Sequence, residues 1–337
     1  MKLSIGIVGL PNVGKSTLFK ALTNQEITIA NYPFATIDPN VGVVPVPDER
    51  LQGLTNLSKS KKTIPAVVEF YDIAGLVKGA NKGEGLGNQF LSHIKETQAI
   101  VIVLRVFQNA EIIHVENSVD PVRDLEIINA ELALKDLDIV EKRLAKAEGE
   151  ARAGKKEAKV IKELLELIKA QLEKGELLTG SPEADALAAD ESLKDLNLLS
   201  AKRQIYLLNG KEEEVSQILK NKIKELKGDY LIADLSEPRS VPELIRKAYA
   251  ILGLISFFTT GEDETRAWTI EKGTLLPQAS GVIHTDFEKK FIRAEVVPWE
   301  KLLEVGGWVQ AKQKGLIRIE GKEYEVKDGD VLVVRHG

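Results

Sequence analysis

The chain contains no cysteine, one methionine and only four histidines among its 337 residues. Without cysteine it forms no disulfide and has neither a thiolate metal site nor a thiol nucleophile. Four histidines, at positions 93, 114, 284 and 336, also disfavour a histidine-rich metal site. The longest purely apolar run, residues 99–104, is far shorter than the roughly 20 residues that a membrane-spanning helix needs. We therefore expect no membrane association, and the cytoplasm is the expected compartment.

Charge of one sign does not dominate the chain. Lysine and arginine total 46 and aspartate and glutamate total 51, which gives a formal net charge of -5. This balance argues against binding nucleic acid with the whole surface, although a local basic face remains possible. With 43% hydrophobic and 29% charged residues, the composition is that of an ordinary globular protein. The length predicts two or three domains, at about 100–200 residues each.

The first thirty residues contain the most specific pattern in the sequence. Residues 3–8 (LSIGIV) are rich in β-branched side chains and predict a buried strand. The next nine residues, GLPNVGKST, complete the motif GxxxxGK[ST], and apolar residues at helical spacing follow. A chance glycine-rich turn is the alternative, which the preceding strand and the following helix disfavour. The pattern therefore predicts a nucleoside triphosphate site.

The residue types of this loop suit phosphate binding. Its glycines let the backbone turn N–H groups toward the β-phosphate, and the start of the following helix adds partial positive charge. Lys15 is expected to reach the β- and γ-phosphates, and the Ser16 hydroxyl is an oxygen ligand suited to Mg²⁺. The predicted phosphate contacts are Gly9, Pro11, Asn12, Val13, Gly14, Lys15, Ser16 and Thr17.

A second motif predicts groups that sense the γ-phosphate. Residues 67–71 read as a strand, and Asp72-Ile-Ala-Gly75 follows it. An aspartate at this position is suited to holding Mg²⁺, usually through water, and the Gly75 N–H can approach the γ-phosphate closely. In the polar loop of residues 31–39, Thr36 can offer its hydroxyl to Mg²⁺ and its N–H to the γ-phosphate. A solvated loop threonine is the alternative for Thr36.

The residue after this motif departs from Ras-like GTPases, which carry a glutamine there to orient the attacking water. Leu76 offers no hydrogen bond, so we expect slow intrinsic hydrolysis or another group that positions the water. His114 is a candidate, because the preceding strand, residues 100–106, is expected to end at the same sheet edge as the phosphate loop. A packed loop histidine is an equally good interpretation. Asn12 is a second candidate aid, since its amide oxygen could coordinate K⁺ across the α- and γ-phosphates; the alternative is a turn-forming asparagine.

The predicted base reader lies later in the chain. Residues 204–208 read as a buried strand that ends at Asn209-Gly210-Lys211-Glu212. GTPases carry N-K-x-D here, and the aspartate accepts two hydrogen bonds from guanine. This chain lacks the lysine at the second position and has glutamate at the fourth, so we expect weakened guanine recognition. Asn209, Gly210 and Glu212 are the predicted base contacts.

Two further regions differ in character from the rest. Residues 120–174 repeat Ala, Leu and Ile at three- and four-residue intervals, with a charged break at 149–156, and predict a helical hairpin. Basic residues near its tip could contact a phosphate backbone, although a solvated face is the more common reason for such a run. From about residue 257 onward, β-like runs alternate with turns and predict a small mixed sheet.

Several long strings together resemble the YchF/Obg-like ATPase family. They are GLPNVGKSTLF, NYPFATIDPNVGVVPVPD, DIAGLVKGANKGEGLGNQFL and RAWTI…PQASGVIHTDFEKKFIRAE…VKDGDV, in that order over essentially the whole chain. The resemblance implies a translation-factor-class protein that prefers ATP to GTP, binds Mg²⁺ and associates with the ribosome through its large subunit or its RNA. By position, residues 12–17 would bind phosphate, Thr36 and Asp72 would serve the switches, and residues 209–212 would read the base. Residues 233–237, which the resemblance places over the base, show no clear motif.

The implied fold is an α/β P-loop NTPase (GTPase-like) domain with two additions. The NTPase domain is expected at residues 1–120 and 201–255, an inserted α-helical coiled-coil hairpin at 121–200, and a C-terminal TGS domain of ubiquitin-like β-grasp type at 256–337. No sequence-specific binding to DNA is expected.

The expected activity is slow hydrolysis of the β–γ phosphoanhydride of ATP by a molecular switch. The catalytic candidates are Lys15, Thr36, Gly75 and His114, and the metal ligands are Ser16, Thr36 and Asp72. Two alternatives stay open: an ATP-binding sensor or scaffold with incidental hydrolysis, and a GTPase of the same architecture.

Overall fold

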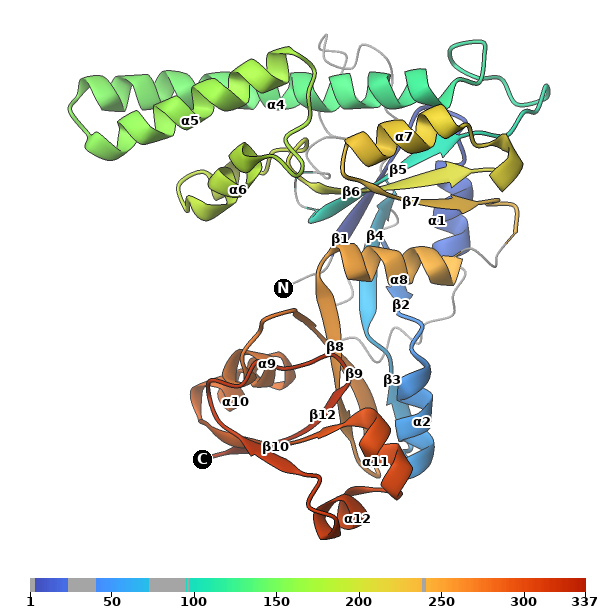
Figure 1. The fold of residues 1–337 in the computed structure, drawn as a ribbon, viewed down its shortest axis with the longest axis vertical. Coiled ribbons are helices and arrows are strands. Elements are labelled where there is room, and N and C mark those ends of the chain that lie inside the picture. Colours follow the sequence, from blue (N-terminus) through green and yellow to red (C-terminus); the bar gives the residue numbers. More distant parts are fainter. Residues whose placement is uncertain (1–3, 24–40, 73–94, 96, 238–240) are drawn as a thin grey trace. The chain divides into compact units, whose positions relative to one another are not determined.

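The computed structural model describes residues 4–23, 41–72, 95, 97–237 and 241–337 (Figure 1). The chain divides into two compact units. One contains the described residues of 1–24, 41–42 and 69–241, and the other contains residues 43–68 together with 242–337. Residues 43–68 therefore group with the C-terminal part of the chain.

A six-stranded sheet forms the centre of the first unit, in the order β2-β4-β1-β5-β6-β7. The strands are β1 (Ser4–Val8), β2 (Val41–Pro45), β4 (Val67–Asp72), β5 (Ala99–Arg105), β6 (Arg203–Asn209) and β7 (Asp229–Ala233). From β4 to β7 neighbouring strands are parallel. Every residue of β5 is buried, as expected for a central strand covered on both faces. The carboxyl ends of parallel strands share one edge, where α/β proteins bind ligands.

Two long helices, α4 (Pro121–Arg152) and α5 (Lys156–Glu173), pack along each other in this unit (Figure 1). Asp120 begins α4, because its carboxylate accepts hydrogen bonds from the N–H groups of Val122 (3.2 Å) and Arg123 (3.1 Å). Buried alanine, valine, leucine and isoleucine side chains join the pair, among them Ala133, Val140, Ala147, Leu165, Ile168 and Leu172. The helices thus occur where the three- and four-residue spacing predicted them.

A buried carboxylate connects α4 to the start of β6. Asp136 accepts hydrogen bonds from Leu199 N (2.9 Å), Ser200 N (2.6 Å) and Ser200 Oγ (2.5 Å). Burial raises the pKa of Asp136 to about 6, although these hydrogen bonds oppose the rise. The segment between the helices and β6 contains α6 (Pro182–Ala189) and the short helix η3 (Lys194–Leu196), and α7 (Gln217–Glu225) links β6 to β7.

The second unit contains a mixed six-stranded sheet in the order β11-β10-β12-β8-β9-β3. Its strands are β3 (Lys62–Ile64), β8 (Leu254–Thr260), β9 (Glu264–Glu271), β10 (Phe291–Pro298), β11 (Arg318–Glu320) and β12 (Asp330–His336). The helices of the unit are α2 (Glu49–Ser58), α8 (Val241–Ile251), α9 (Leu276–Ile283), α10 (Thr285–Lys289), α11 (Trp299–Val305) and α12 (Trp308–Gln313). Phe257, Leu276 and Val296 lie in its core.

Residues 43–68 contribute both an edge strand and an ion pair to this second unit. β3 pairs in parallel with β9, and the Arg50 guanidinium donates to Asp48 (2.8 Å) and to Asp328 (2.6 Å). The predicted mixed sheet is present, and the P-loop α/β fold class is confirmed. The assignment of a TGS β-grasp domain and the three-domain boundaries stay predictions.

Candidate nucleotide-binding site

The phosphate loop connects β1 to α1 (Lys15–Thr23) and requires glycine at two positions. A Cβ on Gly9 would lie 2.7 Å from the backbone oxygen of Val103, closer than real Cβ atoms come. Gly14 has a φ of +109°, and a Cβ there would lie 2.4 Å from Asn209 Nδ2. The close approach of β5 and of the Asn209 side chain therefore explains both glycines of the motif.

Lys15 is folded back over this loop. Its side chain is buried, and Nζ donates hydrogen bonds to the carbonyl oxygens of Gly9 (2.9 Å) and Leu10 (2.7 Å). These contacts hold the ammonium group at the wall of a cavity of about 550 Å³. That volume lies within the range of small-molecule sites, roughly 300–1,000 Å³.

Four segments at or after the carboxyl ends of strands line this cavity. The phosphate loop and α1 contribute Asn12, Gly14, Lys15, Ser16 and Thr17, and the segment after β5 contributes Phe107, Asn109 and Ile112. The segments after β6 and β7 contribute Asn209, Lys211, Glu214, Asp234, Leu235 and Ser236. The structure therefore brings most of the predicted phosphate contacts to one pocket, while Gly9, Pro11 and Val13 complete the loop behind it.

Asn209 joins the phosphate loop to the end of β7. Its Nδ2 donates to Val13 O (2.8 Å), and its Oδ1 accepts from Leu235 N (3.2 Å). The side chain is buried. Asn209 thus contributes to the pocket wall chiefly by holding two loops together, rather than by presenting both amide atoms to a base.

Glu212 is the predicted base contact that the structure places elsewhere. The short helix η4 (Glu212–Glu214) turns its side chain outward, where it forms an ion pair with Lys220. Neither Glu212 nor Gly210 lines the cavity. Glu214 takes a position on the cavity wall instead, and its Oε2 accepts a hydrogen bond from Lys211 N (2.7 Å). The prediction that Glu212 reads the base is therefore not supported by this geometry.

Asp234, Leu235 and Ser236 line the pocket, and they lie in the segment 233–237 that the family resemblance expects to close over the base. Hydrogen bonds to the Asp234 carboxylate from Ser236 Oγ (2.5 Å) and Ser236 N (2.9 Å) lower the pKa of Asp234. An ionised carboxylate therefore lies at the pocket beside Lys211. No motif marks these residues, but their position directly after β7, a strand of the parallel sheet, agrees with that expectation.

Of the oxygen ligands predicted for Mg²⁺, Ser16 is the one whose side chain the structure describes. Ser16 lines the cavity, and Asp72 is paired in register with Ile7, two residues before Gly9. A hydroxyl and a carboxylate are donors that Mg²⁺ prefers. The side chain of Asp72 and all of Thr36, Gly75 and Leu76 lie outside the described residues. Asn12, for which K⁺ was considered, has a left-handed φ of 60°, and its Nδ2 donates to Ile113 O (3.1 Å).

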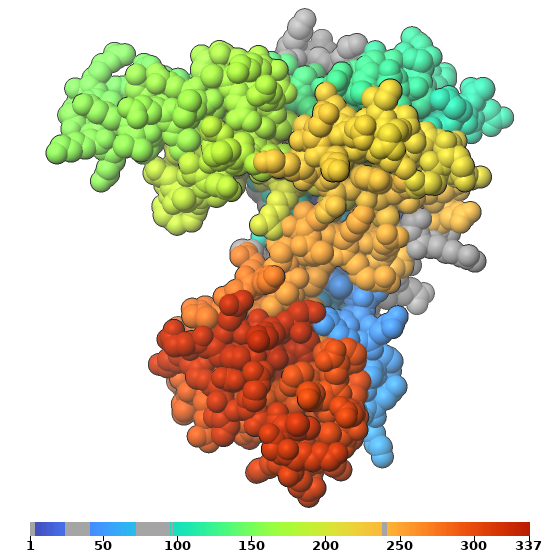
Figure 2. Space-filling view, in the orientation of Figure 1, coloured from blue at the N-terminus to red at the C-terminus, as the bar shows by residue number. Residues whose placement is uncertain are grey.

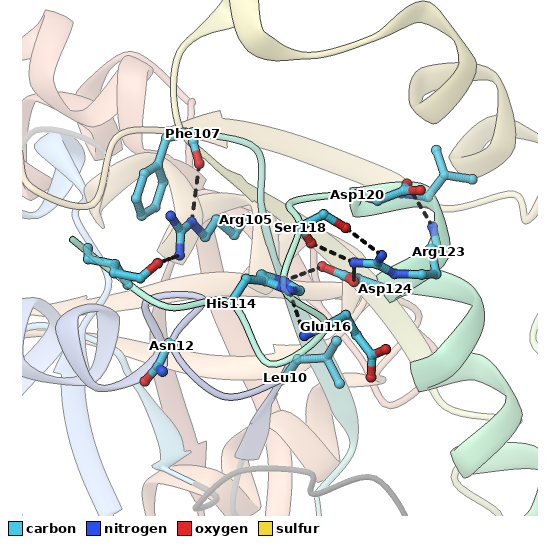
Figure 3. A network of polar contacts seen from close by, with 12 residues as sticks. Leu10, Asn12, Arg105, Phe107, His114, Glu116, Ser118, Asp120, Arg123 and Asp124 are labelled. Atoms are coloured by element: carbon cyan, nitrogen blue, oxygen red, sulfur yellow. Dashed lines mark hydrogen bonds and ion pairs between the residues drawn. The ribbon is translucent and has the colours of Figure 1, made fainter. Parts of the chain in front are cut away.

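His114 is buried between two partners in a network that Figure 3 shows. Its Nε2 lies 2.8 Å from Asp124 Oδ2, and its Nδ1 accepts a hydrogen bond from Glu116 N (3.2 Å). His114 is not on the cavity wall, whereas Ile112, two residues before it, is. Both ring nitrogens therefore have protein partners, and residues 115–116 must move before Nδ1 can contact a water molecule.

The loop that contains His114 is held by Arg105, which the sequence analysis did not single out. This arginine is buried at the end of β5 and donates to the carbonyl oxygens of Phe107 (3.2 Å), Asn109 (3.0 Å) and Ile112 (2.9 Å). Its guanidinium also lies over the Phe107 ring, with the carbon 4.4 Å from the ring centre. A charged residue at the end of an apolar strand was the signal.

Comparison with known proteins identifies the family. The model described as 50S ribosome-binding GTPase matches residues 4–143, and the model of the C-terminal part of YchF GTPases, described as a protein of unknown function, matches residues 254–337. The chain is 45% identical to the ribosome-binding ATPase YchF of Bacillus subtilis (strain 168), with 99% of each chain covered. It belongs to the YchF family.

Other YchF proteins agree with this assignment. The ribosome-binding ATPase YchF of Escherichia coli O157:H7 is also 45% identical, with 98% of each chain covered. The solved structure of the Schizosaccharomyces pombe YchF GTPase is similar with a TM-score of 0.81 and 38% identity, covering 99% of this chain and 98% of that one. The predicted resemblance to the YchF/Obg-like family is thus confirmed.

Proposed function

We propose that this YchF-family chain is a Mg²⁺-dependent ATPase that binds ribosomes and acts as a slow molecular switch. The observation that carries the proposal is the pocket of about 550 Å³ in which the phosphate loop places Lys15 and Ser16 on one wall. The names of the relatives, which describe ribosome-binding ATPases, support it. A nucleotide pocket with a motif for triphosphates favours a hydrolase over a scaffold.

Different residues of the pocket would bind the phosphates and the metal ion. Backbone N–H groups of the phosphate loop and the start of α1 would bind the phosphates. Lys15 Nζ would exchange its carbonyl partners for β- and γ-phosphate oxygens. Ser16 and Asp72, with Thr36, would hold Mg²⁺, which neutralises charge on the phosphates when bound. Thr36 and the Gly75 N–H remain proposed γ-phosphate contacts.

Preference for ATP over GTP is part of the proposal. The chain lacks the N-K-x-D aspartate that accepts two hydrogen bonds from guanine, and Glu212 in its place pairs with Lys220. At the ends of β6 and β7, Lys211, Glu214 and Asp234 supply a donor and acceptors for a base. Asn209 holds the segment after β7 in place through its hydrogen bond with Leu235 N.

Single-turnover hydrolysis of ATP and of GTP, each with and without ribosomes, tests this function. We expect ATP to be hydrolysed faster than GTP and ribosomes to stimulate that rate at least tenfold. A rate that stays slow and unaffected by ribosomes would indicate a sensor or scaffold. Faster hydrolysis of GTP would indicate a GTPase of the same architecture.

K⁺ is proposed as an aid to hydrolysis through Asn12. Since Asn12 Nδ2 donates to Ile113 O, the amide oxygen is the atom suited to a cation. We expect ATP hydrolysis to be several-fold faster in KCl than in NaCl at equal ionic strength. Asn12→Ala should remove that difference, and equal rates in the two salts for the unaltered chain would contradict the role.

The helical pair offers a basic surface for a ribosome. Lys142, Lys146, Lys155, Lys156 and Lys159 are exposed at its free end, which Figure 2 shows in green at the surface of the first unit. Arg143 and Arg152 in the same region form ion pairs with Glu150 (3.8 Å) and Glu148 (3.4 Å). The exposed lysines are therefore the candidates for contact with phosphate backbone.

We also propose three domains: an NTPase domain (1–120 and 201–255), a helical insertion (121–200) and a C-terminal domain (256–337). The protein is further proposed to work in the cytoplasm. None of the described helices has the length and apolar character needed to cross a bilayer.

A further inference from the structure

The hydrogen bonds of His114 determine which of its nitrogens carries the proton. Nδ1 accepts from the backbone N–H of Glu116, so the proton of the neutral ring lies on Nε2. Nε2–H then donates to Asp124 Oδ2 at 2.8 Å, and both side chains are buried (Figure 3). The arrangement makes Nδ1 the unprotonated nitrogen, whose lone pair accepts the hydrogen bond from the Glu116 N–H.

Asp124 is itself held in one orientation and charge state. Its second oxygen, Oδ1, accepts from Arg123 Nη2 (3.1 Å), and Arg123 in turn donates to Ser118 Oγ (2.9 Å) and to Ser118 O (2.7 Å). Burial raises the pKa of Asp124, and the two donors oppose that rise. Because both oxygens accept hydrogen bonds, the group is bound as a carboxylate.

The loop that contains His114 also contacts the nucleotide pocket. Ile112 lines the pocket, and the Ile113 carbonyl accepts a hydrogen bond from Asn12 Nδ2 (3.1 Å). Asp124 lies one turn into α4, so the pair joins the start of this helix to the phosphate loop through residues 112–114. A small movement of residues 115–116 would exchange the Glu116 N–H for water at Nδ1.

We propose that Asp124 is a positioning residue for hydrolysis, which keeps the His114 proton on Nε2 and makes Nδ1 the nitrogen that takes a proton from the attacking water. This inference rests on the proposed ATPase function. The water oxygen forms a bond to the γ-phosphorus while Nδ1 receives its proton. The bond from the γ-phosphorus to the bridging oxygen breaks, and its electron pair leaves with ADP.

The isosteric variant Asp124→Asn separates this role from a packing role. Arg123 can only donate, so the asparagine oxygen should face Arg123 and its NH₂ group should face His114. Nε2 must then accept, which moves the ring proton to Nδ1, opposite the Glu116 N–H. This variant keeps the shape of the site, but Nδ1 is then protonated and can no longer take a proton from water. In the double variant Arg123→Met/Asp124→Asn, the amide is free to turn its oxygen back to His114.

The experiment combines histidine ¹⁵N NMR with single-turnover ATP hydrolysis and ATP affinity, all on the full chain. For the unaltered chain we expect Nε2 protonated and Nδ1 unprotonated, with His114→Ala assigning the signals. In Asp124→Asn we expect the ring proton on Nδ1 instead of Nε2. The rate of ATP hydrolysis should fall about 100-fold, while ATP affinity should stay within twofold of that of the unaltered chain. In Arg123→Met/Asp124→Asn the proton should return to Nε2. Its rate of ATP hydrolysis should be at least a tenth of that of the single variant Arg123→Met.

Asp120→Asn is the matched control, because asparagine also begins helices well and Asp120 does not contact His114; its rate should equal that of the unaltered chain. A protonated Nδ1 in the unaltered chain would overturn the proposal, as would an unchanged rate in Asp124→Asn. The proposal would also be overturned if Asp124→Asn lowered the hydrolysis rate of the His114→Ala variant by the same factor as it lowers that of the unaltered chain. A chain that binds no ATP, or hydrolyses none with ribosomes, would instead refute the proposed function, and the NMR spectrum would still decide the position of the proton.

Discussion

Replacing Lys15 with alanine is expected to weaken ATP binding about 10- to 100-fold and to reduce hydrolysis to background. Hydrogen bonds to charged groups contribute about 1.5–3 kcal/mol each, and Lys15 is the cation that the phosphate loop places at the pocket wall. Equilibrium binding of a fluorescent ATP analogue and single-turnover hydrolysis would measure the two effects.

Lys20→Ala is the matched control for this variant, because Lys20 lies exposed on the same helix, α1. Its affinity and rate should equal those of the unaltered chain. Thermal unfolding would show whether Lys15→Ala is folded, since the carbonyls of Gly9 and Leu10 lose their donor in that variant. A folded Lys15→Ala protein with normal ATP affinity would contradict the assignment of the pocket.

His114→Ala is expected to slow ATP hydrolysis about 100-fold while ATP affinity stays near that of the unaltered chain. A positioned general base contributes roughly 10²–10⁴-fold to a rate, and His114 does not line the cavity proposed to bind the nucleotide. Pre-steady-state hydrolysis and equilibrium binding separate the two quantities. His284→Ala, at an exposed histidine of the second unit, serves as the control. An unchanged rate in His114→Ala would support the alternative of a packed loop histidine.

The secondary structure of the first unit was largely predictable because its signals are local. β-Branched runs predicted β1 and β5, and the glycine pattern between residues 9 and 14 predicted the loop that joins β1 to α1. The spacing of apolar residues predicted α4 and α5, with the charged break found between Arg152 and Lys156. Each of these signals depends on neighbours within one or two turns of the chain.

Other features depended on contacts between distant residues and were not predictable. β3 joins the edge of the second sheet by pairing with β9, about 200 residues later in the chain. The outward turn of Glu212 follows from its ion pair with Lys220 and from the short helix η4, neither of which a motif encodes. Residues 233–237 were expected near the base, but which of them line the pocket (Asp234, Leu235 and Ser236) depended on the pairing of β7 with β6.

The sequence by itself determined the phosphate chemistry, because a loop of nine consecutive residues contains the ammonium, the hydroxyl and the glycines that a triphosphate requires. Only the tertiary structure decided which side chains contact that loop and the residues next to it. His114 and Asp124 meet across ten residues at the start of α4, and Asn209 reaches Val13 across 196 residues. The second contact follows from the order of the parallel strands, which brings their carboxyl ends to one edge whatever their separation along the chain.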